Sequence, residues 1–431
     1  MPGTTQTPLS SHLSNWQLLA YGLPGLPLAI LLLPLFITVP TYYADDLGLG
    51  FATVGFVLLL ARMWDVVTDP LIGILSDRTH SRFGRRRPWL LAGVPLMVIG
   101  AWTLFRPPED IGWAYLAAAT VTLYLGGTMV MLPYTAWAAE LSPDHHERSR
   151  IAGAREAALV LGTLGAMAVP ALFGIDRAVI MDGTAFALLA LAPLTVGVAL
   201  WALPDPALPR PANRQSFRAY GQLWRNRPLR QLISAYFVNG IAYGLPATLF
   251  LLYTEHVLGR PDWSWMLLII YFASAIVALP AWLTISRRLG KRRTWIVAMA
   301  LAATGFWPAA LLGNGDLFWF VAVCIWTGIP LGAELVMPPS MQADVVDLDA
   351  ADSVVKRTGT LFGLWGVATK IPLALGVGIS FPILGLVGFS GQAATNSPAS
   401  LAVLAGLYGL VPVLFKLLAI RLIWNYRVGT S

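Results

Sequence analysis

Apolar residues in this chain stand in long continuous runs, and short polar segments separate one run from the next. Each run is about 18 to 25 residues long, which is the length of helix that crosses the hydrocarbon core of a bilayer. The runs lack the alternating pattern of the strands in a membrane barrel. The pattern predicts an all-α membrane protein with twelve spanning helices, at residues 16–43, 51–75, 89–105, 112–139, 155–173, 184–203, 229–257, 263–285, 295–312, 317–341, 359–389 and 401–423.

Lys and Arg are concentrated in alternate loops, and this asymmetry gives the predicted orientation. The opposite loops contain few basic residues, namely Arg106, Arg177 and Arg260. Because basic loops of multi-pass proteins stay in the cytoplasm, we predict a plasma (inner) membrane protein with both termini cytoplasmic. The basic loops are 82–87, 148–150, 210–230, 287–293 and 356–357.

Two short sequence patterns occur once in each half of the chain. The segment 82–89, RFGRRRPW, corresponds to 288–295, RLGKRRTW, and both follow the second apolar run of their half. A Leu-Pro pair at 132–133 and a Met-Pro pair at 337–338 each lie late in the fourth run of their own half. Two parallel six-helix repeats are typical of the major facilitator fold, in which the solute binds between the halves near the midplane.

A segment rich in Pro and Arg divides the chain nearly in half and suits a linker between two helical bundles. The predicted domains are a cytoplasmic tail at 1–15, a six-helix bundle at 16–203, a cytoplasmic central loop at 204–228, a second six-helix bundle at 229–423 and a cytoplasmic tail at 424–431.

Composition narrows the class of function. The chain is 57% hydrophobic and 12% charged, with a net charge of +7. The basic loops account for this charge, so we predict no nucleic-acid partner. A single cysteine, Cys324, excludes an intrachain disulfide and a thiol redox pair. Because no hydrolase or metalloprotease motif is found, we predict that the protein is not an enzyme and has no cofactor beyond a coupling cation.

The second run contains three charges on one helix face. Arg62, Asp65 and Asp69 stand at i, i+3 and i+7. A charge near the bilayer centre costs about 2.5–3.5 kcal/mol on insertion scales, so this face meets water, a partner or an ion rather than lipid. Two carboxylates one turn apart can ligate Na⁺ or share a proton, which predicts a coupling-ion site. The alternative is a structural ion pair between Arg62 and Asp65.

Lys370 is the comparable cation deep in the second half, inside the eleventh run. The second and eleventh helices of a facilitator fold face each other across the interface between the halves. Lys370 is therefore predicted to neutralise Asp65 or Asp69 when no coupling cation is bound. The alternative is a lysine that extends to the membrane surface.

The basic loop after the second run is predicted to act as a cytoplasmic gate and topology anchor, whose arginines pair with acids such as Glu140 and Asp344. The pair His145-His146, in the loop after the fourth run, has no further metal ligands near it in the sequence. We therefore predict that it is solvated rather than metal-binding. The predicted gate residues are Asp77, Arg78, Arg82, Gly84, Arg85, Arg86, Glu140, Arg148 and Asp344.

At these residues the chain resembles the glycoside-pentoside-hexuronide:cation symporter family (melibiose permease-like) of the major facilitator superfamily. The resemblance runs end to end. It rests on RMWDVVTDP at 62–70, DRTHSRFGRRRP at 77–88, LPYTAWAAEL at 132–141, and QADVVD at 342–347 followed by Lys370.

The resemblance implies a secondary active transporter that works by alternating access and couples Na⁺ or H⁺ to the symport of a small organic solute. Because members of this family transport sugars and glycosides, the resemblance implies a solute of that class. It implies that Asp65, Asp69 and Lys370 form the cation site, with Thr128 as a hydroxyl ligand and Arg62 beside them. Its partners are the solute, the cation and the bilayer, and we expect a monomer.

Two positions depart from the family's sugar transporters. After Tyr21-Gly22, where relatives have a sugar-binding acid, this chain has Leu28 and Ala29, and the acid of the fourth run is replaced by Met131. A sugar would lose its strongest hydrogen-bond acceptors there. The alternatives are a symporter of a more hydrophobic solute such as a lysolipid, or a non-transporting sensor or scaffold. The predicted solute contacts are Arg155, Trp137, Trp365, Met131 and Ala29.

Overall fold

The structure is a computed structural model that describes residues 12–79, 81–142, 145–173, 176–204, 227–352, 358–391 and 396–426. The central loop predicted at 204–228 falls almost entirely outside these ranges. The helices, in chain order, are α1 (Asn15–Gly22), α2 (Gly25–Leu33), η1 (Pro34–Thr38), α3 (Val39–Thr41), η2 (Tyr42–Asp46), α4 (Phe51–Arg78), α5 (Arg87–Phe105), α6 (Trp113–Leu141), α7 (His145–Phe173), α8 (Arg177–Ala202), α10 (Arg227–Leu252), η3 (Tyr253–Val257), η4 (Pro261–Trp263), α11 (Ser264–Leu289), α12 (Lys291–Phe306), η5 (Trp307–Leu311), α13 (Leu317–Asp352), α14 (Thr358–Leu386) and α15 (Pro398–Ile423).

Twelve of the described helical stretches are long and apolar enough to cross a membrane, which confirms the predicted all-α fold class. The sixth span begins earlier than predicted, at Arg177 instead of residue 184. Arg177 therefore belongs to the first turn of α8 and not to a loop. The limits of the apolar run did not predict the part of the helix before residue 184, because charged side chains at a membrane surface can pair with one another while the helix continues.

Proline divides the first span into several pieces. Pro24 precedes α2, and Pro34 starts a π-helical turn at η1. Proline lacks an N–H donor and displaces the carbonyl four residues earlier, so each of these positions interrupts the regular helix. The end of the seventh span also has a π-helical turn, η3, and it corresponds to η2 at the end of the first span.

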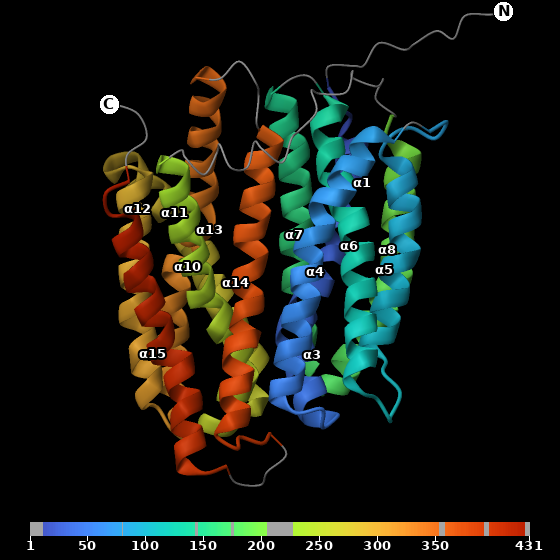
Figure 1. Ribbon diagram of the computed structural model, residues 1–431. Helices are drawn as coiled ribbons and strands as arrows, with labels where there is room; N and C mark the ends of the chain where they lie inside the picture. Colours follow the sequence, from blue (N-terminus) through green and yellow to red (C-terminus); the bar gives the residue numbers. More distant parts are fainter. Residues whose placement is uncertain are drawn as a thin grey trace, which may run out of the picture.

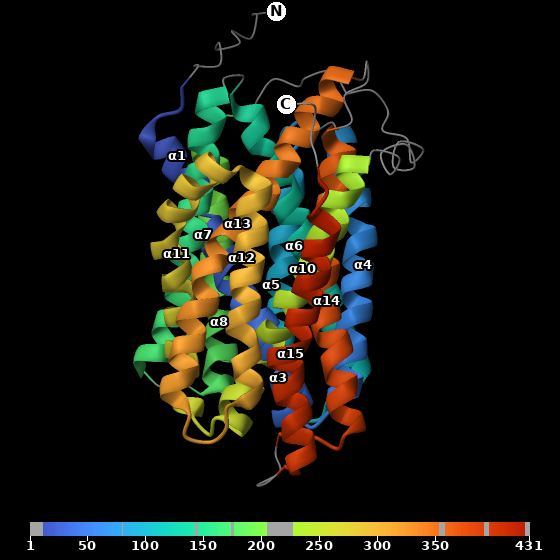
Figure 2. The same cartoon turned by 90° about the vertical axis from the view of Figure 1, so that its left-hand side faces the viewer.

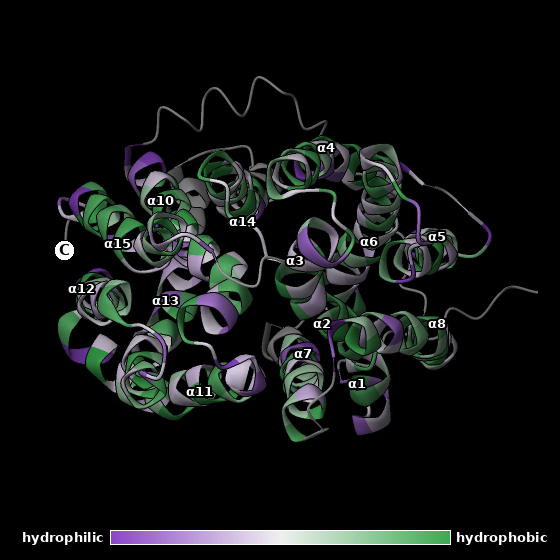
Figure 3. Ribbon diagram, turned by 90° about the horizontal axis from the view of Figure 1, so that it is seen from below, coloured by the Kyte–Doolittle hydropathy of each residue, from purple (hydrophilic) through white to green (hydrophobic). Residues whose placement is uncertain are grey.

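The twelve candidate spans form two groups, one from each half of the chain, which stand side by side in Figure 1. Figure 2 shows the same arrangement from the side, with the second half in front. In the first half α6 packs on α4 and α5, α2 on α7 and α8 on α5, whereas in the second half α10 packs on α14 and α15, and α13 on α11 and α12. The halves meet mainly where α4 packs on α14, with a smaller contact between α7 and α11. Viewed along the helix axes, the two groups lie side by side, and many residues along the helices are apolar (Figure 3).

Two ends of the bundle are named here for reference. The termini end is where α1 begins at Asn15 and α15 ends at Ile423, and the far end is where α4 begins at Phe51 and α14 ends at Leu386 (Figure 1). Toward the far end α4 and α14 approach closely. A Cβ added at Gly55 would lie 2.9 Å from the Cβ of a phenylalanine on α14, so a glycine is required for this distance.

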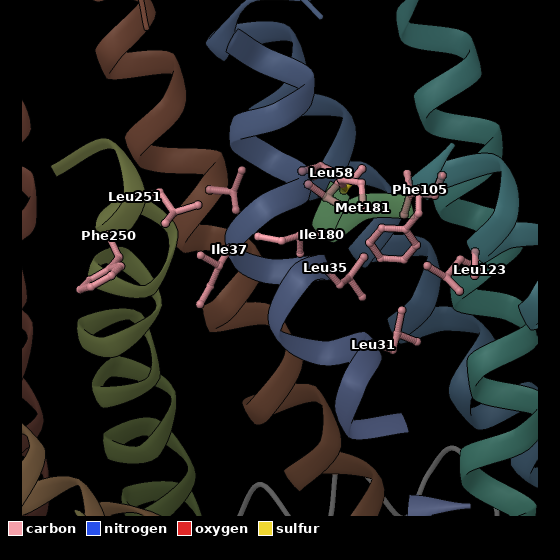
Figure 4. Close-up of a cluster of buried hydrophobic side chains, with 14 of the residues drawn as sticks. Leu31, Leu35, Ile37, Leu58, Phe105, Leu123, Ile180, Met181, Phe250 and Leu251 are labelled. Carbon is pink, nitrogen blue, oxygen red and sulfur yellow. The ribbon is translucent and has the colours of Figure 1, made fainter. Parts of the chain in front are cut away.

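The apolar core continues from one half into the other. The largest cluster of buried side chains includes Leu35 and Phe105 of the first half and Phe250 and Leu251 of α10 (Figure 4). Many large apolar side chains are exposed on the outside, and Leu386 is 87% exposed. Such an apolar exterior is suited to lipid rather than to water.

The repeated loop sequence corresponds to a repeated backbone conformation. Gly84 and Gly290 occupy equivalent positions in the two copies, and both have positive φ, at 92° and 79°. This region of backbone conformation is costly for any residue with a Cβ. Each glycine lies just before the helix that opens the third span of its half, so the two loops are built alike.

Candidate functional site

The five residues of the predicted coupling site meet where α4, α6 and α14 touch. Arg62 Nη1 lies 3.0 Å from Asp65 Oδ2. Thr128 Oγ1 lies 2.8 Å from Asp65 Oδ1 and 2.9 Å from Asp69 Oδ1, so its single proton can be donated to either carboxylate. Lys370 Nζ lies 2.6 Å from Asp69 Oδ2 and 2.9 Å from Asp65 Oδ2.

The Asp69–Lys370 side of this site is more accessible than the Arg62–Asp65 side. Arg62 and Asp65 are buried, at 6% and 2% exposed, whereas the side chains of Asp69 and Lys370 are 18% and 30% exposed. The Arg62 guanidinium also lies over the ring of Tyr124, at 4.2 Å, which stabilises a buried cation. The two cations and two carboxylates cancel in charge, and Asp69 and Lys370 form the side from which an ion can reach them.

The donor set suits a hard cation. Asp65, Asp69 and Thr128 bring five oxygen atoms together, and oxygen is the ligand type that such cations prefer. Among the described residues, no group of three or more His, Cys, Asp or Glu side chains is arranged as a metal site. These oxygen atoms are of the type that coordinates a cation or accepts a proton, and Lys370 now occupies two of them.

The two halves share this site. Asp65, Asp69 and Thr128 come from the first half, and Lys370 comes from α14 of the second. The close packing between α4 and α14 extends from the far end up to this point, where Gly378 would place a Cβ 2.8 Å from Leu59. An exchange of partners at Lys370 therefore acts directly on the contact between the halves.

The predicted solute contacts occupy different environments. Met131 is 38% exposed, and Trp365 is partly buried and stacks on Tyr236, with ring centroids 4.1 Å apart and planes inclined by 13°. Trp137 and Ala29 are packed in the interior, at 1% and 0% exposed. Neither of these two side chains presents a surface to a solute in this conformation, and their solute role stays a prediction.

Arg155, the fifth predicted solute contact, lies on α7 with a partly accessible side chain. It donates to Glu156 at 2.6 Å, and its guanidinium lies 3.5 Å from Thr135 Oγ1 on α6. Arg155 is therefore a point of contact between α7 and α6.

The predicted gate residues form two pairs at the termini end. Arg86 Nη2 lies 2.6 Å from Glu140 Oε1, and Arg85 lies 3.5 Å from the same oxygen. Asp344 contacts Lys291, at 2.6 Å, rather than an arginine of 82–87. Lys291 is the repeat counterpart of Arg85, so each half holds its own loop against its own fourth span.

Among the remaining charged gate residues, the structure describes the side chains of Arg78 and Arg82. Arg82 lies over the ring of Phe83, at 4.7 Å, and Arg78 ends α4. The side chains of Asp77 and Arg148 are outside the described part of the chain.

Glu147 anchors the start of the chain at the termini end. Its carboxylate accepts the backbone N–H of Leu13 at 2.9 Å, and it contacts His12 and Arg150 at 3.1 and 2.8 Å. Burial acts to raise the pKa of Glu147, but these hydrogen bonds outweigh it and hold the pKa below its ordinary value.

Sequence reasoning missed two further groups of charges. In the second half Lys416 contacts both carboxylate oxygens of Glu334 at 2.8 Å, and Asn239 donates to the same carboxylate at 2.8 Å. At the far end Arg177 contacts acids of both halves. The signal for the first group was an ionisable residue inside an apolar run, which the bilayer makes costly unless it has a partner.

The chain is similar to known transporters over most of its length. Residues 20–430 match the family described as MFS/sugar transport protein. The chain is 27% identical over 410 residues to the glucuronide carrier protein homolog of Escherichia coli, covering 90% of this chain and 86% of that protein. It is 24% identical over 424 residues to the sodium-dependent lysophosphatidylcholine symporter 1 of Homo sapiens, covering 88% of this chain and 77% of that protein.

Solved structures share the fold. The crystal structure of the nucleoside transporter NupG superposes with a TM-score of 0.69 at 13% identity, covering 96% of this chain and 100% of that one. A bacterial homolog of the human lysosomal transporter Spinster, in an inward-facing conformation, gives a TM-score of 0.64 at 13% identity, covering 96% of this chain and 98% of that one.

Proposed function

Because the chain belongs to the MFS/sugar transport protein family, we propose that it is a cation-coupled symporter in which Asp65 and Asp69 bind the coupling cation. Its place in this family and its twelve spanning helices make it a multi-pass membrane transporter of the symporter type. We further propose that the coupling cation is Na⁺ or H⁺, that the membrane is the inner membrane, and that the termini end faces the cytoplasm.

One observation carries this proposal. The ammonium of Lys370, from the second half, lies on two carboxylates of the first half, and Thr128 joins those carboxylates from a third helix. An ammonium has the same charge as the coupling cation and competes for the same oxygens. Cation binding and the contact between the halves are thus two uses of one site.

The proposed cycle follows from this competition. A cation that binds Asp65 and Asp69 displaces Lys370 and weakens one contact between the halves, which lets the solute bind between them. The loaded halves, 16–203 and 229–423, then rock about the site as rigid bodies. A ligand shifts such an equilibrium only by the difference between its affinities for the two states, and here the displaced Lys370 supplies that difference.

At the termini end the pairs Arg86–Glu140 and Lys291–Asp344 are proposed to act as parts of a gate. Each pair lies within one half, so it fixes the position of its own loop. Solute contact is proposed for Arg155, Met131 and Trp365, the predicted residues whose side chains remain at least partly accessible.

The test is calorimetric binding of Na⁺ and of protons to the purified protein at several pH values, without solute. Asp65→Asn and Asp69→Asn are each expected to abolish cation binding. The matched control is Asp182→Asn, which removes an exposed carboxylate at the far end. Unchanged cation binding in both site variants would make the carboxylates structural and would favour a uniporter or a non-transporting scaffold.

A second candidate function keeps the fold and the cation site but transports an amphiphile. It is favoured by the accessible apolar surface of Met131 and by the likeness to a lysophosphatidylcholine symporter. Counterflow in proteoliposomes with a labelled glycoside and with labelled lysophosphatidylcholine separates the candidates. If the solute is a lysolipid, Met131→Asp is expected to lower its transport, because the new carboxylate must be desolvated against the acyl chain. A glycoside transporter is expected to tolerate or benefit from the same change.

A further inference from the structure

One arginine at the far end contacts acids from both halves. Arg177, on the first turn of α8, lies 2.9 Å from Asp46 and 3.5 Å from Asp45, both at the end of the first span. Its other terminal nitrogen contacts Glu255, at the end of the seventh span. The planar guanidinium has donors on two sides, so it can bind carboxylates of two bodies at once.

Two of the three acids that meet at Arg177, Asp45 and Glu255, are repeat counterparts, and Asp46 follows Asp45 directly. The first span ends in Tyr43-x-Asp45 and the seventh in Tyr253-x-Glu255, and both segments adopt a π-helical turn. Tyr43 donates its hydroxyl to a carbonyl oxygen of α5, at 2.7 Å, and Tyr253 donates to one of η5, at 2.5 Å. Each tyrosine is fully buried and holds the turn that presents its acid. The two halves therefore bring equivalent acids to one place, and Arg177 stands between them.

The contact between the halves at the far end depends on the positive charge of Arg177, because the other charged groups that it joins are all acids. Asp45 is 6% exposed, and its carboxylate also lies against Gly391, where a Cβ would come within 2.0 Å of it. Without the arginine, Asp45 and Asp46 of the first half would face Glu255 of the second as like charges. Like charges that face each other across an interface repel, so the loss of Arg177 turns an attraction between the halves into a repulsion.

A cavity of about 540 Å³ adjoins Arg177 at the far end. Tyr42 and Pro170 of the first half and Leu251 and Trp265 of the second line it. Its walls belong to both halves, so it widens if the halves separate there. Leu251 is 5% exposed and is a position at which such widening can be measured.

We propose that Arg177 is a positioning residue that holds the far end closed by bridging Asp46 of the first half to Glu255 of the second, and that the release of this bridge opens the carrier toward the far end. This rests on the alternating access of the proposed function. It adds a second contact between the halves, distinct from Lys370, whose strength sets how much of the protein is open at the far end.

The test measures how fast a cysteine at position 251 reacts with a membrane-impermeant maleimide. Leu251→Cys is placed in a Cys324→Ser background in sealed vesicles, and Asp262→Cys, which is exposed at the far end, identifies vesicles of the required orientation. Arg177→Gln and Glu255→Gln are each expected to raise the labelling rate about tenfold or more, the factor that follows from losing one charge-assisted hydrogen bond.

Three controls give the result its meaning. Arg106→Gln breaks an ion pair with Asp182 at the same end but within one half, so it is expected to leave the labelling rate unchanged. Arg177→Lys keeps the charge but not the two-sided geometry and should give an intermediate rate. The exchange Arg177→Glu with Glu255→Arg places opposite charges across the interface again and should return the rate toward that of the parent.

A labelling rate that stays at the parent value in both Arg177→Gln and Glu255→Gln would overturn the proposal. It would also be overturned if Arg106→Gln raised the rate as much, or if the exchange variant failed to lower it. The measurement uses neither solute nor cation. A protein that transports nothing but shows the expected rates would therefore refute the proposed function while retaining the bridge, and a symporter with unchanged rates would refute only the bridge.

Discussion

Asp65 and Asp69 share a proposed role, but we expect their removal to have very different costs in stability. Asp65→Asn leaves Arg62, which is 6% exposed, without its carboxylate in the interior of the bundle. Breaking a buried ion pair by removing one partner costs about 3–5 kcal/mol. Asp69→Asn leaves Lys370 still 2.9 Å from Asp65 and 30% exposed, so about 1 kcal/mol is expected.

Thermal unfolding of the purified variants in one detergent measures this difference as a gap between their Tm values. The matched test is the double variant Arg62→Met with Asp65→Leu, which replaces the buried pair by apolar side chains of similar size. It is expected to recover most of the stability lost in Asp65→Asn, because no charge is left unpaired, and yet to bind no cation. Equal Tm losses in Asp65→Asn and Asp69→Asn would refute this reasoning, as would a double variant no more stable than Asp65→Asn.

Three further outcomes are expected. Gly55→Ala should destabilise the protein by about 1–3 kcal/mol in thermal unfolding, because its Cβ overpacks against α14 at 2.9 Å, whereas the control Gly183→Ala, with open space around it, should not. The pKa of Glu147 is lower in the folded state, so the ionised carboxylate stabilises the fold above the ordinary carboxyl pKa, and this contribution is lost as pH falls through the folded pKa. Glu147→Gln should therefore reduce the loss of Tm in acid, and an unchanged dependence of Tm on acid pH would contradict this. Lys416→Met should lower Tm by leaving the buried Glu334 carboxylate without a cation, and adding both Glu334→Leu and Asn239→Leu, which removes the polar groups that contact one another there, should restore it. Failure to restore Tm would mean that the polar cluster itself stabilises the fold.

The proposed coupling site could be predicted from the sequence because of the cost of charge in a bilayer. Three charges on one face of an apolar helix are costly in lipid, so their spacing alone indicated a site. The long-range partner Lys370 required knowledge of the fold, which the repeat and the family resemblance supplied. The structure brings these residues together on α4 and α14 as expected.

Other parts could not be derived from the sequence. The depth of a residue in a span does not tell whether its side chain faces a solute or packs between helices. Trp137 and Trp365 were both predicted as deep residues, yet Trp137 is buried and Trp365 is partly exposed. Arg177 looked like a loop residue because the apolar run begins seven positions later, at 184. The pairing of Glu334 with Lys416 joins the tenth and twelfth spans, and no local pattern relates two single charges so far apart.

The cancelling charges at the coupling site have a consequence for energetics. The formal charges of Arg62, Lys370, Asp65 and Asp69 sum to zero, so one Na⁺ bound as proposed would give the loaded site a net charge of +1. With an uncharged solute, each turnover would then move one positive charge across the bilayer. A potential of about 100 mV contributes about 2.3 kcal/mol per charge, which corresponds to roughly fiftyfold accumulation of the solute before any Na⁺ gradient is counted. Voltage alone, imposed with a potassium ionophore, is therefore expected to drive uphill uptake.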